Sequence, residues 1–133
     1  MKLNEVYPNL FIRGQFYKWP AKRKEQALAA ANIHAVVSCI TYYDADMKTT
    51  VKYFHRPMPD SDNIDERRVE EISVLVAQMI SNGLRVVIHC RAGQNRSAFI
   101  AARAIQLLTL CTGEEAIARV RRGRPNALTN PWF

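Results

Sequence analysis

The stretch VVIHCRAGQNRSAFIAARAI, from Val86 to Ile105, passes from an apolar run through a short polar loop into a second apolar run. The β-branched residues that precede His89 predict a buried strand, and the residues from about Arg96 to Leu110 predict a helix. The same alternation of strand and helix recurs along the chain. We therefore expect an α/β domain with a largely parallel central sheet flanked by helices.

Other segments on both sides of this stretch fit the same alternation. Strands are expected at Leu10–Ile12, Ile33–Ile40 and 51–58, and helices at Pro20–Ala31, at 66–83 and at 112–123. Pro20 suits a first helical turn, and the pairs Asn63 with Glu66 and Thr112 with Glu115 predict helix caps. A chain of 133 residues suits one domain, so we expect residues 1–133 to form a single domain.

The composition is that of an ordinary globular protein, with 48% apolar and 23% charged residues. Apolar runs are too short for a membrane span, and the first ten residues, MKLNEVYPNL, lack the apolar core of an export signal. We therefore expect a cytoplasmic location. The formal charge of +7 favours an anionic partner, such as a phosphorylated protein, nucleic acid or a membrane surface. The alternative is that the charge is spread over solvated faces and serves solubility.

The chain has three widely spaced cysteines, Cys39, Cys90 and Cys111, and no CxxC pair. This pattern argues against a disulfide framework and against a zinc knuckle. His89 and Cys90 are adjacent in a predicted strand, so their side chains should point to opposite faces and should not share a metal ion. Cys39 lies in a predicted apolar strand and is expected in the core, and Cys111 is expected late in a helix with a packing role. We predict no metal and no cofactor.

Cys90 stands where a predicted strand gives way to a helix, which is where open α/β sheets bind ligands. The free N–H groups and the dipole of a helix N-terminus favour phosphate. A loop of small or polar residues can direct its amides at the same anion, and here that loop consists of Arg91, Ala92, Gly93, Gln94 and Asn95. Arg96 adds a planar fork of donors that matches two phosphate oxygens.

In such a loop Cys90 would be favoured as a thiolate, which can attack phosphorus in line. Ser97 could donate a hydrogen bond to the sulfur when it becomes the leaving group. The alternative is that Cys90 is a buried structural thiol at a strand end. The loop is not a nucleotide-binding P-loop, because GxxxxGK[ST] is absent.

The segment HCRAGQNRS, residues 89–97, matches HCxxGxxR[ST], and on this motif the chain resembles the cysteine-dependent protein tyrosine phosphatases. Its short length resembles the small atypical members of the dual-specificity branch. PNLFIRGQ, VVSCI, PMPDSDN and GEEAIARVRRGRP also follow one another in that family's order.

The resemblance implies a role for each residue of the motif. Cys90 is the implied nucleophile and forms a phosphocysteine intermediate, and Arg96 binds the phosphate and the transition state. His89 favours the thiolate, Ser97 assists breakdown of the intermediate, and the loop 91–95 supplies amides. The implied reaction needs no metal.

The resemblance also implies a general acid about thirty residues before the cysteine, and Asp60 matches that position better than Asp62. The expected substrates are phosphotyrosine and also phosphoserine or phosphothreonine, because the deep-pocket tyrosine motif of the large phosphotyrosine-specific phosphatases is not evident. An RNA 5′-phosphatase and a phosphate-binding module without turnover are the alternatives. Asn130 matches an asparagine of the family, but we expect its usual supporting helix to be missing, because the sequence stops at NPWF.

Overall fold

The computed structural model describes residues 3–13, 19–40, 43, 45, 51–58, 65–90 and 96–125. In chain order, the elements are β1 (Asn4–Tyr7), β2 (Leu10–Arg13), α1 (Ala21–Ala30), β3 (Ala35–Ser38), β4 (Lys52–His55), α2 (Glu66–Ser81), β5 (Val86–His89), α3 (Arg96–Thr109) and α4 (Gly113–Gly123). This alternation confirms the predicted α/β class. The predicted strands and helices all occur, with bounds shifted by a few residues, and β1 is an additional strand.

The five strands form one sheet in the order β1-β2-β5-β3-β4. β1 pairs antiparallel with β2, whereas the pairs β2–β5, β5–β3 and β3–β4 are parallel. The prediction of a largely parallel sheet is therefore confirmed. Parallel pairing brings the carboxyl ends of β2, β5 and β3 to one edge, where Arg13 and Ser38 are both in register with His89.

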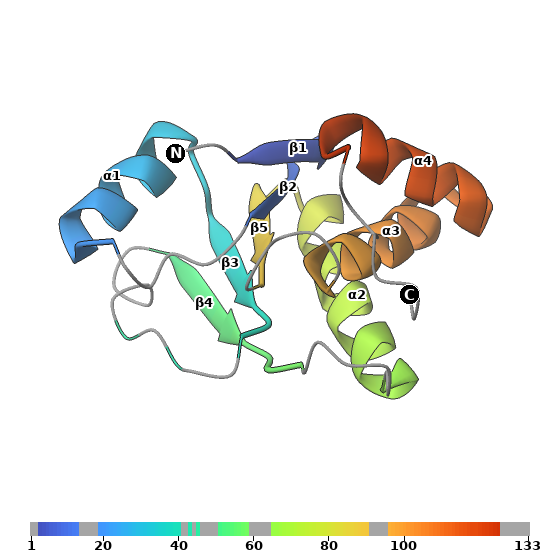
Figure 1. Cartoon of the computed structure of the whole chain (residues 1–133), viewed down its shortest axis with the longest axis horizontal. Coiled ribbons are helices and arrows are strands. Elements are labelled where there is room, and N and C mark those ends of the chain that lie inside the picture. The colour runs from blue at the N-terminus through green and yellow to red at the C-terminus, as the bar shows by residue number, and fades with distance from the viewer. Residues whose placement is uncertain are drawn as a thin grey trace.

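Helices cover both faces of the sheet (Figure 1). α1 lies on one face, where Leu28 packs with a small apolar cluster that includes Val36 and Val87. α2, α3 and α4 lie on the other side, over a larger cluster that includes Val37 and Ile88. Strand residues thus alternate between two apolar faces, which explains why the strands read as continuous apolar runs.

The helix ends test the predicted caps. The Thr112 hydroxyl accepts a hydrogen bond from the Glu115 amide at 3.1 Å, as predicted. The prediction that Asn63 caps α2 is wrong, because Asp65 is the capping residue and its carboxylate accepts from the Arg68 amide at 3.1 Å. The side chain directly before the helix reaches the free amides, so the helix begins later than the Asn63 pattern indicated.

α1 also begins slightly later than predicted. Pro20 has extended backbone angles, φ −58° and ψ 147°, and is the capping residue, so it does not occupy the first helical turn. The stop at the end of α2 is as predicted: Gly83 has a φ of 81°, which glycine adopts without steric cost. Among the described helices, none combines the length and the apolar character that crossing a membrane requires.

Candidate active site

The candidate site is built on the ends of neighbouring strands. The Cys90 amide, just after β5, donates to the carbonyl of Arg13 on β2 at 3.2 Å. The Cys39 amide, just after β3, donates to the carbonyl of His89 at 2.9 Å. Sheet pairing thus continues to the two cysteines and holds the main chain at Cys90 on both sides.

Cys90 meets Ser97 across the start of α3. The Cys90 Sγ and the Ser97 Oγ are 3.4 Å apart, and both side chains are almost fully buried, at 2% and 0% exposed. Because α3 begins at Arg96, Ser97 lies in its first turn, close to the free amides of the helix. The structure therefore brings together two residues that the sequence motif paired.

Arg96 is buried at the same place, with 5% of its surface exposed. Its Nη1 donates to the carbonyl of Met58 at 2.7 Å and to the carbonyl of Cys39 at 3.2 Å. Its buried Nε has no hydrogen-bond partner among the residues that the structure describes. A buried donor without a partner is costly, so this edge of the guanidinium is suited to an anionic ligand.

His89 is fully buried, and its charged form is disfavoured. Burial lowers the pKa of His89 to about 3, and the positive charge of Lys24 on α1 contributes the next largest effect. The imidazole is therefore neutral near pH 7. Cys90 belongs to the core cluster on the side of α3, which agrees with the prediction that neighbouring residues His89 and Cys90 face opposite sides of the sheet.

Cys39 is a fully buried core residue, as predicted. Burial is the main cause that raises the pKa of Cys39 to about 12, and the nearby Cys90 adds to it, whereas Arg96 and Arg68 oppose it. Its thiol is therefore protonated at neutral pH. Cys111 is half-buried and packs against the larger apolar cluster as predicted, but its predicted place in a helix is wrong, because α3 ends at Thr109.

Several predicted site residues lie outside the described residues. They are the general-acid candidates Asp60 and Asp62, the loop residues Arg91, Ala92, Gly93, Gln94 and Asn95, and Asn130. Tyr43, which follows β3 in the chain, is among the described residues. It is half exposed and makes edge contacts with Tyr53 and His55, at ring-centroid distances of 5.3 and 5.7 Å.

Sequence reasoning missed two contributors to the site. Met58 is 2% exposed and orients Arg96 through its carbonyl, a role that leaves no trace in side-chain chemistry. Lys24 is 3% exposed within α1, although lysine is rarely buried. The sequence does not indicate that Lys24 is buried, because the apolar residues of α1 do not form a clear helical pattern. Among the described residues, no group of three or more His, Cys, Asp or Glu could hold a metal ion.

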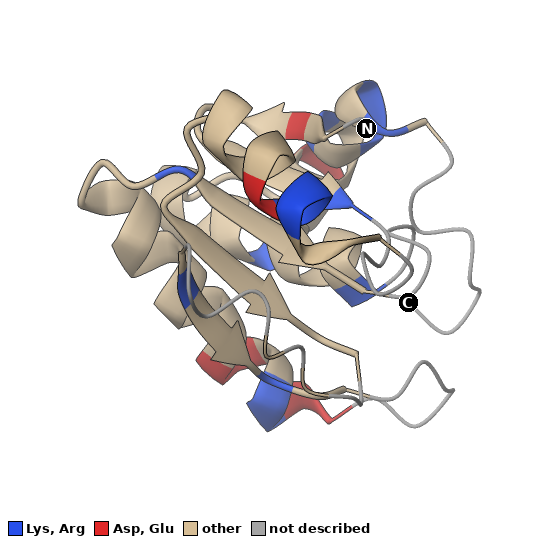
Figure 2. Cartoon of the chain, turned by 90° about the vertical axis from the view of Figure 1, so that its left-hand side faces the viewer, with Lys and Arg blue, Asp and Glu red and all other residues tan. Residues whose placement is uncertain are grey.

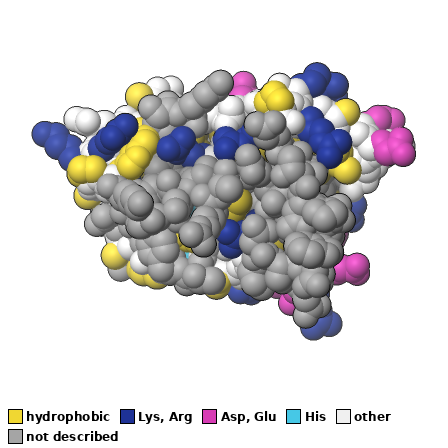
Figure 3. Space-filling model, viewed as in Figure 1, with side chains coloured by type: hydrophobic (Ala, Val, Ile, Leu, Met, Phe, Trp, Pro, Cys, Tyr) yellow, Lys and Arg dark blue, Asp and Glu magenta, His cyan; other side chains and the backbone are white. Residues whose placement is uncertain are grey.

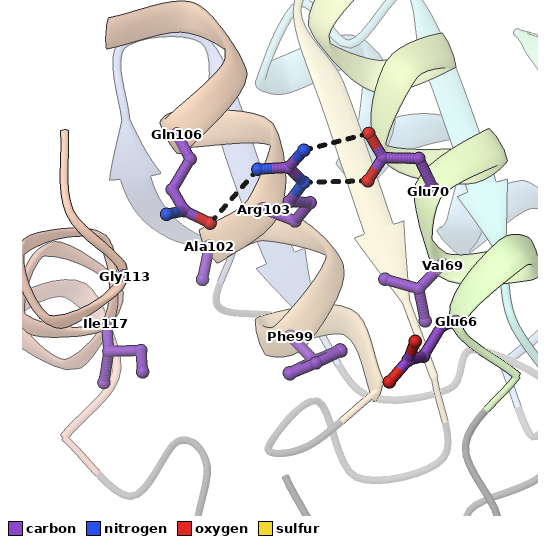
Figure 4. Close-up of a pocket in the computed structure, with 9 residues that line it drawn as sticks. All are labelled: Glu66, Val69, Glu70, Phe99, Ala102, Arg103, Gln106, Gly113 and Ile117. Atoms are coloured by element: carbon purple, nitrogen blue, oxygen red, sulfur yellow. Dashed lines mark hydrogen bonds and ion pairs between the residues drawn. The ribbon is translucent and has the colours of Figure 1, made fainter. Parts of the chain in front are cut away.

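A separate cavity of about 310 Å³ lies among α2, α3 and α4 (Figure 4). Val69, Phe99 and Ile117 supply its apolar walls, and its lining does not include Cys90 or Arg96. At its rim, Arg103 makes two bonds to the Glu70 carboxylate, at 2.8 and 3.0 Å. This bidentate pair ties α3 to α2.

Comparison with known proteins agrees with this geometry. The family "Dual specificity phosphatase, catalytic domain" matches residues 14–133. The chain therefore belongs to the dual-specificity phosphatases, within the cysteine-dependent protein tyrosine phosphatases, and its domain is a phosphatase domain. No curated protein sequence matches the chain.

Solved phosphatase structures share the fold. Tk-PTP in its active form is 25% identical with a TM-score of 0.79, and the alignment covers 96% of this chain and 88% of that one. Human DUSP28 is 22% identical with a TM-score of 0.82, covering 98% and 86%. A mouse putative dual specificity phosphatase, complexed with zinc tungstate, is 21% identical with a TM-score of 0.83, covering 98% and 80%.

Proposed function

We propose that this chain hydrolyses phosphate monoesters through a phosphocysteine intermediate on Cys90, with phosphotyrosine in proteins as its main substrate and phosphoserine and phosphothreonine as further substrates. The observation that carries the proposal is the placement of Cys90 beside Ser97 and buried Arg96 at the start of α3. Membership of the dual-specificity phosphatases supports the same chemistry.

In the first step, the Cys90 thiolate attacks phosphorus and an S–P bond forms as the bond to the leaving oxygen breaks. Asp60 gives its proton to that oxygen. In the second step, the Asp60 carboxylate takes a proton from water, whose oxygen attacks phosphorus. The S–P bond breaks, phosphate leaves and the thiolate returns, and the Ser97 hydroxyl donates a hydrogen bond to the sulfur as its charge reappears.

Arg96 supplies the fixed positive charge. Its Nη1 is held by the carbonyls of Cys39 and Met58, so the guanidinium is oriented before any substrate binds. Its Nε edge is then free to donate to phosphoryl oxygens, and amides of the loop 91–95 bind the remaining ones. Donors that are positioned in advance stabilise the transition state without reorganisation.

Neutral His89 fits this mechanism as a positioning residue. It lies directly before Cys90, and its main-chain carbonyl accepts the bond from Cys39. Because its charged form is disfavoured by burial, the imidazole stays neutral near pH 7 while Arg96 carries the positive charge at the phosphate.

A second candidate function keeps the chemistry and changes the substrate. The formal charge of +7 favours a polyanion, so hydrolysis at the 5′-phosphates of RNA is the alternative. The deciding experiment uses purified protein with a metal chelator present and measures phosphate release from three substrates: a phosphotyrosine peptide, a phosphothreonine peptide and 5′-triphosphorylated RNA.

The expected result is chelator-resistant hydrolysis that is fastest on the phosphotyrosine peptide and competitively inhibited by vanadate. A wide preference for RNA would overturn the proposed substrate class. Absence of hydrolysis on all three substrates by folded protein would contradict the proposed function itself.

A further inference from the structure

The end of α3 exposes a leucine in an unfavourable backbone conformation. Leu110 directly follows α3 and is 90% exposed, whereas the other exposed large apolar side chains of the described residues, Tyr43 and Val74, are 50% and 37% exposed. Its φ is 61°, a left-handed conformation that glycine or asparagine usually adopts after a helix. Neither the exposure nor the conformation stabilises an isolated chain, so Leu110 is suited to contact with another molecule.

Hydrogen bonds hold the main chain around Leu110 in place. The Leu110 amide donates to the carbonyl of Gln106 at 2.7 Å. On its two sides, the Thr109 hydroxyl donates to the carbonyl of Ile105 at 2.8 Å and accepts from the amide of Cys111 at 3.3 Å. The leucine is therefore presented by a fixed turn, and little main-chain freedom remains to be lost when it binds.

An open groove lies beside Leu110, between the second halves of α2 and α3. Its volume is about 520 Å³, and one wall is formed by Leu107 and Leu108, which lie within one helical turn before Leu110. The other wall belongs to α2 and its capping residue and consists of Val74, Ala77, Gln78, Ser81 and Asn82. Leu110 and this groove together form one surface, which we call the leucine surface.

The leucine surface carries no formal charge. The charged residues of α2 all lie between Glu66 and Glu71, at the start of the helix (Figure 2), and residues 72–84 and 104–113 contain no Asp, Glu, Lys or Arg. Charged residues make up 23% of the chain, and its net charge of +7 makes copies of it repel one another. Copies can approach most easily through an uncharged surface, and depletion of charge is typical of the centre of protein interfaces.

We propose that two copies of the chain associate through the leucine surface, with Leu110 of each copy inserted into the groove of the other. Because the leucine and the groove belong to the same surface, a two-fold axis satisfies both contacts at once and the assembly closes as a dimer. An acidic protein or a nucleic acid would be attracted to a different place, the Lys and Arg side chains that extend along the upper part of Figure 3 from α1 to α4.

The candidate active site lies away from this contact. Cys90 meets Ser97 at the start of α3, whereas Leu110 follows its end, and a helix of 14 residues is about 20 Å long. The inference therefore goes beyond the proposed function, and association can be measured without any substrate.

The test is sedimentation velocity of the purified chain at concentrations from about 1 to about 300 µM, a range that covers the affinity of a small interface. Wild type should show a reversible equilibrium between monomer and dimer. Leu110→Asn should weaken association by about a hundredfold or more, because two leucine side chains lose their burial. Its thermal unfolding temperature at low concentration should equal or exceed that of wild type, since asparagine adopts a positive φ more readily than leucine.

A groove variant tests the other half of the contact. Val74→Glu places a charge in the groove, so this variant should stay monomeric, and it should stay folded because glutamate is a good helix former. In a mixture of the two variants, Leu110 of the groove variant meets the intact groove of Leu110→Asn, so mixing should restore part of the dimer. Tyr43→Ser is the matched control, because it removes an exposed apolar side chain outside the leucine surface and should associate like wild type.

Three results would overturn the proposal. Wild type that stays monomeric at the highest concentration would show that the leucine surface serves another partner or none. Association of Leu110→Asn as strong as that of wild type would exclude the leucine contact. Failure of the two monomeric variants to associate when they are mixed would exclude reciprocal insertion.

Discussion

β5 and β3 are neighbouring parallel strands, and each is followed by a buried cysteine. Cys39 contributes its main chain: its amide donates to His89, and its carbonyl accepts from Arg96 and from the amide of Met58. Cys90 instead presents its sulfur to the Ser97 hydroxyl at the start of a helix. The contrast indicates that contact with the start of α3 places the Cys90 thiol for chemistry, whereas Cys39 supports the site through its main chain.

The matched substitutions Cys90→Ser and Cys39→Ser test this contrast, and the first should have the largest effect. A serine hydroxyl has nearly the shape of the thiol but stays protonated near neutral pH, so Cys90→Ser should abolish turnover. Its fold and its binding of vanadate should remain, as shown by circular dichroism and by titration of the ligand. Substantial turnover by this variant would refute the phosphocysteine mechanism.

The next prediction concerns the acid that follows β4. Asp60→Ala should lose about a hundredfold to ten-thousandfold in kcat on a phosphate ester with a poor leaving group. The loss should shrink for a good leaving group, which departs without a proton, and the requirement for a protonated residue should vanish from the pH profile.

Asp62→Ala is the control for Asp60, since it removes the neighbouring carboxylate and should mainly lower stability. The assignment of the acid is wrong if Asp62→Ala shows the dependence on the leaving group and Asp60→Ala does not.

Arg96 links the two strand ends, because it directly precedes Ser97, which contacts Cys90, and it donates to the carbonyl of Cys39. Arg96→Lys keeps the positive charge but loses the planar fork, so kcat should fall by about a hundredfold to a thousandfold. Steady-state kinetics on a phosphotyrosine peptide measure the loss. Near-normal kinetics would mean that Arg96 does not bind the phosphoryl group.

Cys39→Ser completes the matched pair and should have the opposite outcome to Cys90→Ser. The serine hydroxyl would be buried in an apolar cluster, so the free energy of unfolding should fall by about 1–3 kcal/mol. Turnover should change by less than about threefold, because Cys39 accepts the hydrogen bond from Arg96 through its main-chain carbonyl, which the substitution keeps. Urea unfolding measures the loss of stability, and steady-state kinetics measure turnover. A loss of turnover in protein of unchanged stability would contradict the structural role assigned to Cys39.

The smallest expected effect is a pH dependence of stability that comes from His89. Burial lowers the pKa of His89 to about 3 in the folded protein, whereas the unfolded chain binds this proton near pH 6.5. The stabilisation is therefore complete above about pH 6.5 and is lost as the pH falls toward 3, with a slope of at most about 1.4 kcal/mol per pH unit. Unfolding curves between pH 7 and pH 5 measure it, and His89→Gln should flatten that slope.

The local elements and the motif could be predicted from the sequence alone. The apolar run before His89, the Thr112 cap and the Gly83 stop depend on neighbours in the chain, and the structure confirms all three. The motif from His89 to Ser97 could also be recognised from the sequence, because all of its residues lie close together in the chain, between one strand and the helix that follows it.

The meeting of distant groups could be seen only in the tertiary structure. Arg96 donates to the carbonyls of Cys39 and Met58, which follow other strands of the sheet. Every residue has a main-chain carbonyl, so the side-chain pattern of the sequence cannot predict these two contacts. Arg13 and Arg23 share the Trp19 ring because Phe11 of β2 and Leu28 of α1 pack in one cluster, a contact that the spacing of these residues in the sequence does not indicate. Local propensity acts over a few residues, whereas contacts of this kind depend on how strands pair and helices pack across the whole chain.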